Sequence, residues 1–170
     1  MRKERKNVME TRDLTYISIL IDSLKKKIEV LERLKDETVK QEELLSRDEL
    51  DFDAFNKTIE SKEKSLNRLN EIDDGFMEIY EKVAPILKKD TASFENEVTY
   101  LKELVRRVTD YSTTLTALEE RNKIKLSIHL NRGKQRIKEY KQSSKTVAAY
   151  YKNIANKRTP EGSTFYDRKK

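Results

Sequence analysis

The chain has no cysteine and no tryptophan, and its 170 residues include only three glycines and two prolines. Without cysteine it can form neither a disulfide nor a thiolate metal site, and a reducing compartment is allowed. All-β and α/β folds need many more glycines and prolines than this for their turns. These absences therefore favour an all-α fold with few, long elements.

The residues that usually carry catalysis or hold a cofactor are also scarce. His129 is the single histidine, so a zinc site would lack ligands, and a Ser-His-Asp triad could use only this residue, which lies in a helical, basic stretch. We expect His129 to be a partly exposed helix residue. The glycines at positions 75, 133 and 162 are isolated, and they form no phosphate-binding loop. We expect a protein that is not an enzyme and that binds no cofactor and no metal.

Long apolar runs are missing as well. No stretch reaches the roughly 18–20 apolar residues of a membrane-spanning helix, so we expect no membrane insertion. The basic start, Met1 to Lys6, has no apolar segment behind it, which argues against a secretory signal. We therefore expect the protein to act in the cytoplasm.

What the sequence does contain is charge, on 40% of its residues, and apolar residues at helical spacing. Three segments repeat apolar residues every three or four positions, which places them on one helix face. Polar residues interrupt each stripe. The first stripe thins at Thr38 and Gln41, and the third reaches Asn122 on the same seam just beyond its last apolar residue. The second follows a heptad pattern that Lys62 and Asp73 interrupt. The stripes run from Ile17 to Leu45, from Phe55 to Leu87 and from Phe94 to Leu118.

Breaks in these patterns predict where helices begin and end. We expect residues 1–12 to be frayed and the first helix to begin near Asp13. Asp51 is suited to cap the second helix, because its carboxylate can accept from a free backbone N–H of the first turn. Pro85 lacks a backbone N–H and should bend or end that helix. The sequence thus predicts an elongated antiparallel helical hairpin or three-long-helix bundle, coiled-coil-like, as the body of the protein over residues 1–132.

The charge is divided unevenly along the chain. Residues 1–120 carry 22 Lys/Arg against 28 Asp/Glu, whereas residues 121–170 carry 15 against 3. After Gly133 a short apolar stripe on a basic background predicts an amphipathic helix, and from Lys157 the composition predicts disorder. We therefore expect residues 133–170 to form a flexible basic C-terminal arm.

The apolar stripe of this arm is our candidate partner-binding site, since such a helix can dock into a groove or fold on binding. Val147, Tyr151 and Ile154 would supply the buried contact, and Tyr150 would flank it. Two structural alternatives are a fourth core helix and an extension of the third helix. A functional alternative is nucleic-acid binding, with Lys/Arg on phosphates and tyrosines stacked on bases. The candidate partner-binding residues are Ile137, Tyr140, Val147, Tyr150, Tyr151 and Ile154.

Four segments in order carry a resemblance to a known family. An acidic break over 48–55 is followed by Leu-Asn-Glu-Ile-Asp-Asp-Gly-Phe at 69–76, by Leu-Glu-Glu-Arg-Asn at 118–122, and by Ala-Tyr-Tyr-Lys-Asn at 149–153 before a basic end. From about Thr15 onward this order resembles the FlgN family of flagellar type III export chaperones, in the form found in clostridia and their relatives. The resemblance implies a cytoplasmic helical chaperone. It would bind the C-terminal helices of hook-associated (filament-junction) proteins, keep them unassembled and deliver them to the export gate.

The resemblance also implies which parts meet which partners. The C-terminal segment would bind cargo, and a tyrosine among Tyr140, Tyr150 and Tyr151 would contact the export gate. The expected partners are hook-associated flagellar proteins and export gate or ATPase components of the flagellar type III apparatus. A nucleic-acid-binding protein and a structural coiled coil are the alternatives, nucleic acid being the less favoured partner. Pairing of two copies into a homodimer stays open.

Overall fold

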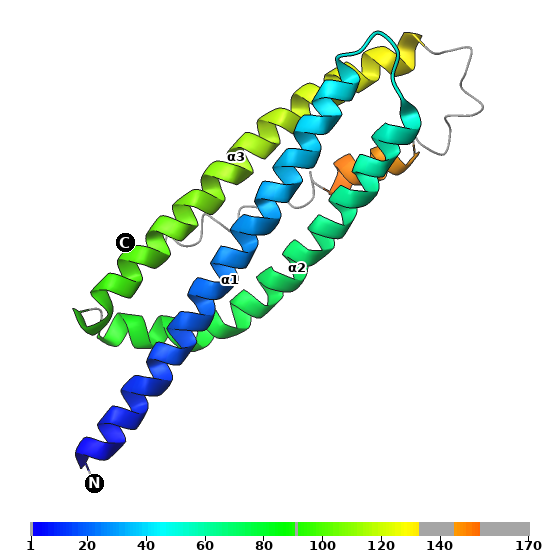
Figure 1. Cartoon of the computed structure of the whole chain (residues 1–170). Helices are drawn as coiled ribbons and strands as arrows, with labels where there is room; N and C mark the ends of the chain where they lie inside the picture. Colours follow the sequence, from blue (N-terminus) through cyan, green and yellow to red (C-terminus); the bar gives the residue numbers. More distant parts are fainter. Residues whose placement is uncertain (1, 91, 133–144, 154–170) are drawn as a thin grey trace. The chain divides into compact units, whose positions relative to one another are not determined.

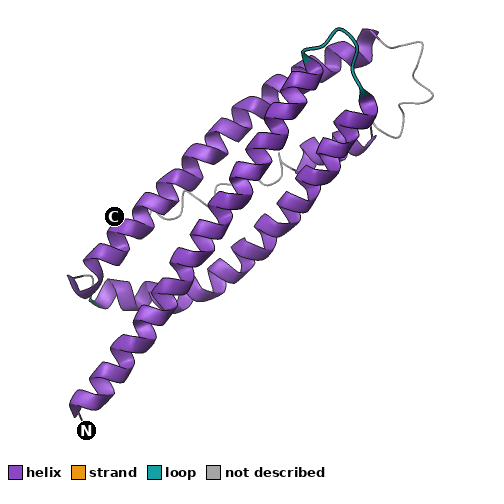
Figure 2. Ribbon diagram, in the orientation of Figure 1, coloured by secondary structure: helices purple, strands orange, loops and turns teal. Residues whose placement is uncertain are grey.

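The computed structural model of the chain describes residues 2–90, 92–132 and 145–153, and all regular structure within these ranges is helical (Figure 2). The prediction of an all-α fold is thus confirmed. Three long helices contain most of the described residues (Figure 1). The helices are α1 (Arg2–Leu45), α2 (Phe52–Lys89), the 3-10 helix η1 (Ala92–Phe94), α3 (Glu95–Arg132) and a further helix over residues 145–153.

The chain divides into two compact units, and each long helix contributes to both. Unit 1 takes residues 1–34 and 65–113, and unit 2 takes residues 35–64 and 114–170. Each unit is therefore assembled from segments that are distant in the sequence.

Unit 1 has an apolar interior. In this unit α1 and α2 run antiparallel, because Lys27 pairs with Asp73 while Tyr16, earlier in α1, lies under Lys82, later in α2. The interior forms by burial of the apolar stripes that the sequence places on one face of each helix. Its buried cluster comprises Ile17, Leu20, Leu24, Ile28, Val83, Phe94, Leu101 and Leu104.

Unit 2 contains the end of α1, the start of α2, the end of α3 and the helix over residues 145–153. Here α1 and α3 run parallel. Asn122 donates to the backbone oxygen of Thr38, and His129 lies 2.8 Å from the backbone oxygen of Leu45, so contacts advance along both helices together. The buried apolar residues are Leu44, Leu45, Phe55, Ile59, Leu115, Leu118, Leu126, Val147 and Tyr150.

In both connections between the long helices, an aspartate caps the first turn of the helix that follows. The backbone N–H of Ala54 donates to Asp51 Oδ1 at 2.9 Å, which confirms the predicted N-cap of α2. The N–H of Ser93 donates to Asp90 Oδ1 at 3.2 Å, and the Ser93 hydroxyl donates to Asp90 Oδ2 at 2.7 Å. These bonds satisfy backbone donors that have no partner within the helix that follows.

One predicted helix limit is wrong. α1 begins at Arg2 rather than near Asp13, and the Lys, Arg and Glu residues ahead of Asp13 are good helix formers. α2 continues through Pro85 and ends at Lys89, in keeping with the predicted bend or end near this proline. The predicted arm is described only at residues 145–153, since 133–144 and 154–170 lie outside the described residues.

Candidate functional site

The interior of unit 2 holds polar side chains from all three long helices. Thr38 and Gln41 come from α1, Lys62 from α2, and Glu119 and Asn122 from α3, and each is at most 5% exposed. The two residues on α1, and the two on α3, are three positions apart and therefore share a helix face. Among the described residues, every buried polar or charged side chain belongs to unit 2.

An ion pair between Lys62 and Glu119 lies at the centre. Lys62 Nζ donates to Glu119 Oε1 and, at 2.6 Å, to Gln41 Oε1. Glu119 Oε1 also accepts from the Thr38 hydroxyl at 3.1 Å. Burial lowers the pKa of Lys62 from 10.5 to about 8, although the charges of Glu119 and Glu37 oppose this shift. A buried charge needs such partners, because taking an ion out of water costs several kcal/mol.

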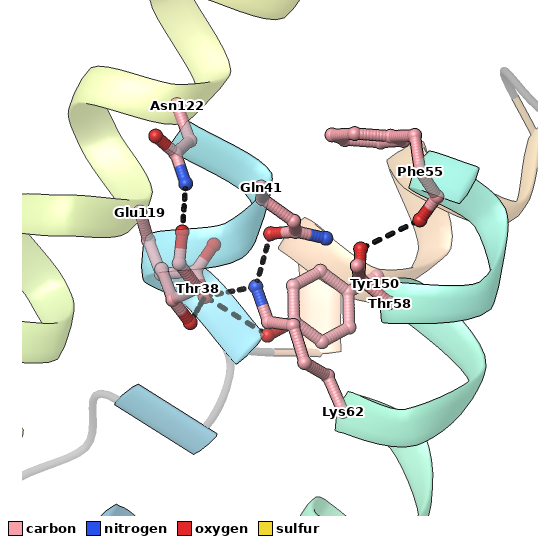
Figure 3. Close-up of polar contacts among 8 residues, drawn as sticks. All are labelled: Thr38, Gln41, Phe55, Thr58, Lys62, Glu119, Asn122 and Tyr150. Atoms are coloured by element: carbon pink, nitrogen blue, oxygen red, sulfur yellow. Dashed lines mark hydrogen bonds and ion pairs between the residues drawn. The ribbon is translucent and has the colours of Figure 1, made fainter. Parts of the chain in front are cut away.

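Tyr150, from the helix over residues 145–153, completes the group (Figure 3). Its hydroxyl donates to Glu119 Oε1 at 2.9 Å, and its ring centroid lies 4.3 Å from Lys62 Nζ. Burial and the Glu119 charge raise the pKa of Tyr150, so its hydroxyl keeps its proton and remains a donor. The contact therefore engages both ends of a tyrosine, its ring by a cation–π interaction and its hydroxyl by a hydrogen bond. We call Thr38, Gln41, Lys62, Glu119, Asn122 and Tyr150 the polar cluster.

Some polar atoms of the cluster have no hydrogen-bond partner among the described residues. They are Gln41 Nε2, Glu119 Oε2 and Asn122 Oδ1. Lysine can only donate, so the Gln41 oxygen must face Lys62 and its amide nitrogen must point away. The cluster thus retains a buried donor on Gln41 and a buried acceptor on Glu119 that Tyr150 does not use.

Charged and polar contacts extend from the cluster along α1 and α3. Glu42 lies 3.3 Å from Lys125 and 3.4 Å from Arg121, and Lys125 also donates to the Ser46 hydroxyl at 3.1 Å. His129 is half-buried near the end of α1, as the sequence predicts for a partly exposed helix residue. These contacts hold the last turns of α1 against α3.

The structure describes three of the six predicted partner-binding residues. Val147 and Tyr150 are buried, at 7% and 1% exposed, and Tyr151 is half-buried. Tyr150 was expected at the flank of the apolar face but lies inside unit 2, because Glu119 accepts from its hydroxyl there. This burial is what a fourth core helix would show, and partner binding through these residues stays a prediction. The other three, Ile137, Tyr140 and Ile154, lie outside the described residues.

Sequence reasoning missed the polar cluster. Lys62, Gln41 and Thr38 were noted only as interruptions of their stripes, and Glu119 only within a family-like segment. The available signal was that polar residues interrupt the apolar stripes of all three helices. Each interruption considered alone suggests a less stable point in its helix. When three such helix faces meet, however, their charged and amide side chains can pair by hydrogen bonds.

The residues that the structure describes contain neither a group suited to a metal ion nor a helix suited to a membrane. No group of three or more His, Cys, Asp and Glu side chains there could hold a metal ion. In the same part of the chain, no helix combines the length and apolar character needed to cross a membrane.

The fold and the polar cluster together define the class of this protein. It is a helical protein with three long helices and a polar cluster inside one of its two units. The family follows from comparison with known families. The chain belongs to the FlgN family, whose model, described as FlgN protein, matches residues 9–158. FlgN is a chaperone family not known for catalysis, and membership is consistent with a role in flagellar export. Comparison with curated proteins and with solved structures found no match.

Proposed function

We propose that this protein is a cytoplasmic flagellar type III export chaperone for hook-associated proteins. It binds their C-terminal helices, prevents their premature assembly and delivers them to the export gate. The observation that carries the proposal is the match to the FlgN family over residues 9–158, which spans parts of both units and the helix over residues 145–153. A chaperone of this kind acts by covering an apolar helix face, since such a face would otherwise associate with other subunits.

The proposed cargo contact is the apolar stripe of the C-terminal segment. It comprises Ile137, Tyr140, Val147, Tyr150, Tyr151 and Ile154, and one of its tyrosines is the proposed contact to the export gate. Support comes from the exposed Lys145, Ala148 and Lys152, which leave one side of this helix accessible. Val147 and Tyr150 contribute only when their helix leaves unit 2, because both are buried there.

Calorimetric titration of the full chain with the C-terminal segment of a hook-associated protein from the same organism tests this function. We expect saturable binding to that segment. The matched control is the C-terminal segment of flagellin, a flagellar protein that is not hook-associated, and it should bind much more weakly. Absence of binding to every hook-associated segment of the organism would refute the proposal.

Nucleic-acid binding is the second candidate, favoured by the 15 Lys/Arg against 3 Asp/Glu in residues 121–170. The two candidates differ in their response to salt. Binding through phosphates releases counterions and weakens steeply as salt rises, whereas burial of an apolar helix face depends on salt much less. We expect cargo binding with a shallow salt dependence. Tight binding of RNA or DNA at physiological salt would favour the alternative.

A further inference from the structure

The ion pair beside Tyr150 keeps its other hydrogen bonds when Tyr150 is absent. The bonds from Lys62 to Glu119 and Gln41, and from Thr38 to Glu119, all join residues of α1, α2 and α3. When Tyr150 leaves, the buried ion pair therefore keeps its partners and no charge is stranded.

Within unit 2, the helix over residues 145–153 packs on the long helices through one face, and the hydroxyl of Tyr151 is also buried there. Val147 and Tyr150 are its two buried residues among those described, and they lie three positions apart on one face. The remaining positions are half-buried or exposed, and Lys145, Ala148 and Lys152 are exposed. This helix thus packs through one aliphatic and two aromatic side chains of one face, as a bound peptide helix does.

The cluster also has binding capacity that Tyr150 leaves unused. Glu119 Oε2 is a buried acceptor and Gln41 Nε2 a buried donor, and neither has a partner among the described residues, although both side chains are at least nine-tenths buried. Buried polar groups are normally paired, so the cluster is suited to a docked helix that carries a polar side chain rather than apolar ones alone. Figure 3 shows Gln41, Lys62 and Glu119 converging on Tyr150 from three different helices.

We propose that Gln41, Lys62 and Glu119 form a receptor for a tyrosine-bearing amphipathic helix, and that residues 145–153 are its exchangeable internal occupant. The incoming helix carries an aliphatic residue three positions before its tyrosine, as Val147 precedes Tyr150. This inference rests on the proposed function, because the incoming helix comes from the cargo. Its binding displaces residues 145–153 and exposes the stripe that the proposed function assigns to the partner.

Thiol labelling measures whether the internal helix is docked. The chain has no cysteine, so a single introduced thiol reports on its own site. Val147→Cys places the thiol at a buried position, and Ala148→Cys is the exposed control in the same helix. We expect the thiol of Val147→Cys to be alkylated at least about tenfold more slowly than the thiol of Ala148→Cys. When Tyr150→Phe is added to both variants, most of this difference in rate should disappear. Equal rates for the two thiols would overturn the proposal.

A peptide added in trans tests the receptor itself. The probe is a labelled synthetic peptide with the sequence of residues 141–157, and the protein is the full chain with Tyr150→Ala, which lacks the internal tyrosine. We expect this chain to bind the peptide at least tenfold more tightly than the unaltered chain, a difference of about 1.4 kcal/mol. Replacing the tyrosine at position 150 of the peptide by phenylalanine should weaken binding about tenfold, and by alanine further.

Each outcome of the peptide experiment decides the proposal. Equal affinity for the altered and unaltered chains, or equal affinity of the three peptides, overturns it. Thermal melts recorded alongside show that each chain is folded, and Tyr150→Phe replaces Tyr150→Ala if the latter does not melt cooperatively. Neither experiment contains cargo. The receptor can therefore fail while the hook-associated segment still binds in calorimetry, and the reverse result would refute the proposed function alone.

Discussion

The same three helices build two different interiors. In unit 1 every buried side chain among the described residues is hydrophobic, and Ile17, Leu20 and Leu104 are each 1% exposed. In unit 2 Lys62 and Glu119 are buried with the amides of Gln41 and Asn122. Each long helix runs without a break from one unit into the other, so the helices themselves are not what differs. The difference comes from the residues on their buried faces, which are apolar in unit 1 and partly polar in unit 2.

The two interiors differ in stability and in selectivity. An apolar interior contributes stability in proportion to the area it buries, but many apolar side chains of similar size fit it almost equally well. A buried ion pair contributes little net stability, but it accepts only partners that meet its donors and acceptors. Unit 1 therefore suits a scaffold, whereas unit 2 suits recognition of a particular side chain, here the ring and hydroxyl of Tyr150.

The largest expected effect comes from removing one charge of unit 2. Glu119→Leu leaves the Lys62 ammonium buried without its carboxylate, and breaking a buried pair in this way costs about 3–5 kcal/mol. Tyr150 and Thr38 lose their acceptor at the same time. The measurement is the free energy of unfolding from urea denaturation of the full chain.

The matched control removes both charges together. Lys62→Met with Glu119→Leu should recover most of the lost stability, because apolar residues of similar volume often replace a buried pair at little cost. If the double variant is as unstable as Glu119→Leu, the loss comes from packing and not from the unpaired charge, and the two interiors then differ less in how they are stabilised.

In unit 1 the corresponding effect comes from a cavity. Leu104→Ala removes a side chain that is 1% exposed within the apolar cluster, and such changes cost about 2–5 kcal/mol. We expect about 3 kcal/mol by urea denaturation, with the same loss at every pH because no charge is involved. Met77→Ala is the control: Met77 is 48% exposed, so the loss should stay within about 0.5 kcal/mol. A loss below about 1 kcal/mol for Leu104→Ala would contradict a well-packed apolar interior.

The sequence predicts unit 1 better than unit 2. Apolar spacing identified the three helices and most of the unit 1 interior, because burial of a stripe is a local property of each helix. The polar cluster could not be predicted in this way, since whether Lys62 is a solvated interruption or a buried ion depends on Glu119, 57 positions away. The position of Tyr150 depends on the same long-range contact. Its assignment to the flank followed from the helical spacing of the apolar residues around it, and that spacing does not reveal that Glu119 accepts from its hydroxyl.

A third effect depends on pH and belongs to unit 2. Burial holds the pKa of Lys62 near 8, below 10.5, so between these values the unfolded chain binds more protons than the folded chain. Stability from this group therefore rises with pH across that window. Above about pH 10 the raised pKa values of Tyr150 and Tyr151 act in the opposite direction, because the unfolded phenols lose their protons first.

The size of this rise can be isolated by subtraction. One pKa unit corresponds to about 1.4 kcal/mol, so we expect the unaltered chain to gain about 1–3 kcal/mol relative to Lys62→Met between pH 8 and pH 10. Subtraction removes the contributions of groups common to both chains. Urea denaturation at several pH values measures it. A difference between the two chains that does not change with pH would show that Lys62 titrates as an exposed lysine.

The smallest expected effect should not distinguish the two units. Asp51 caps the start of α2 in unit 2, and Asp90 caps the turn before α3 in unit 1. Replacing an N-cap aspartate by alanine costs about 1 kcal/mol, because a backbone N–H loses its acceptor whatever the interior beneath it contains. We expect Asp51→Ala and Asp90→Ala to lower the free energy of unfolding by similar amounts, and Asp51→Asn, which keeps an acceptor, to lower it little. If Asp51→Ala costs several times more than Asp90→Ala, the loop before α2 also supports the polar cluster, and the contrast between the units extends beyond their interiors.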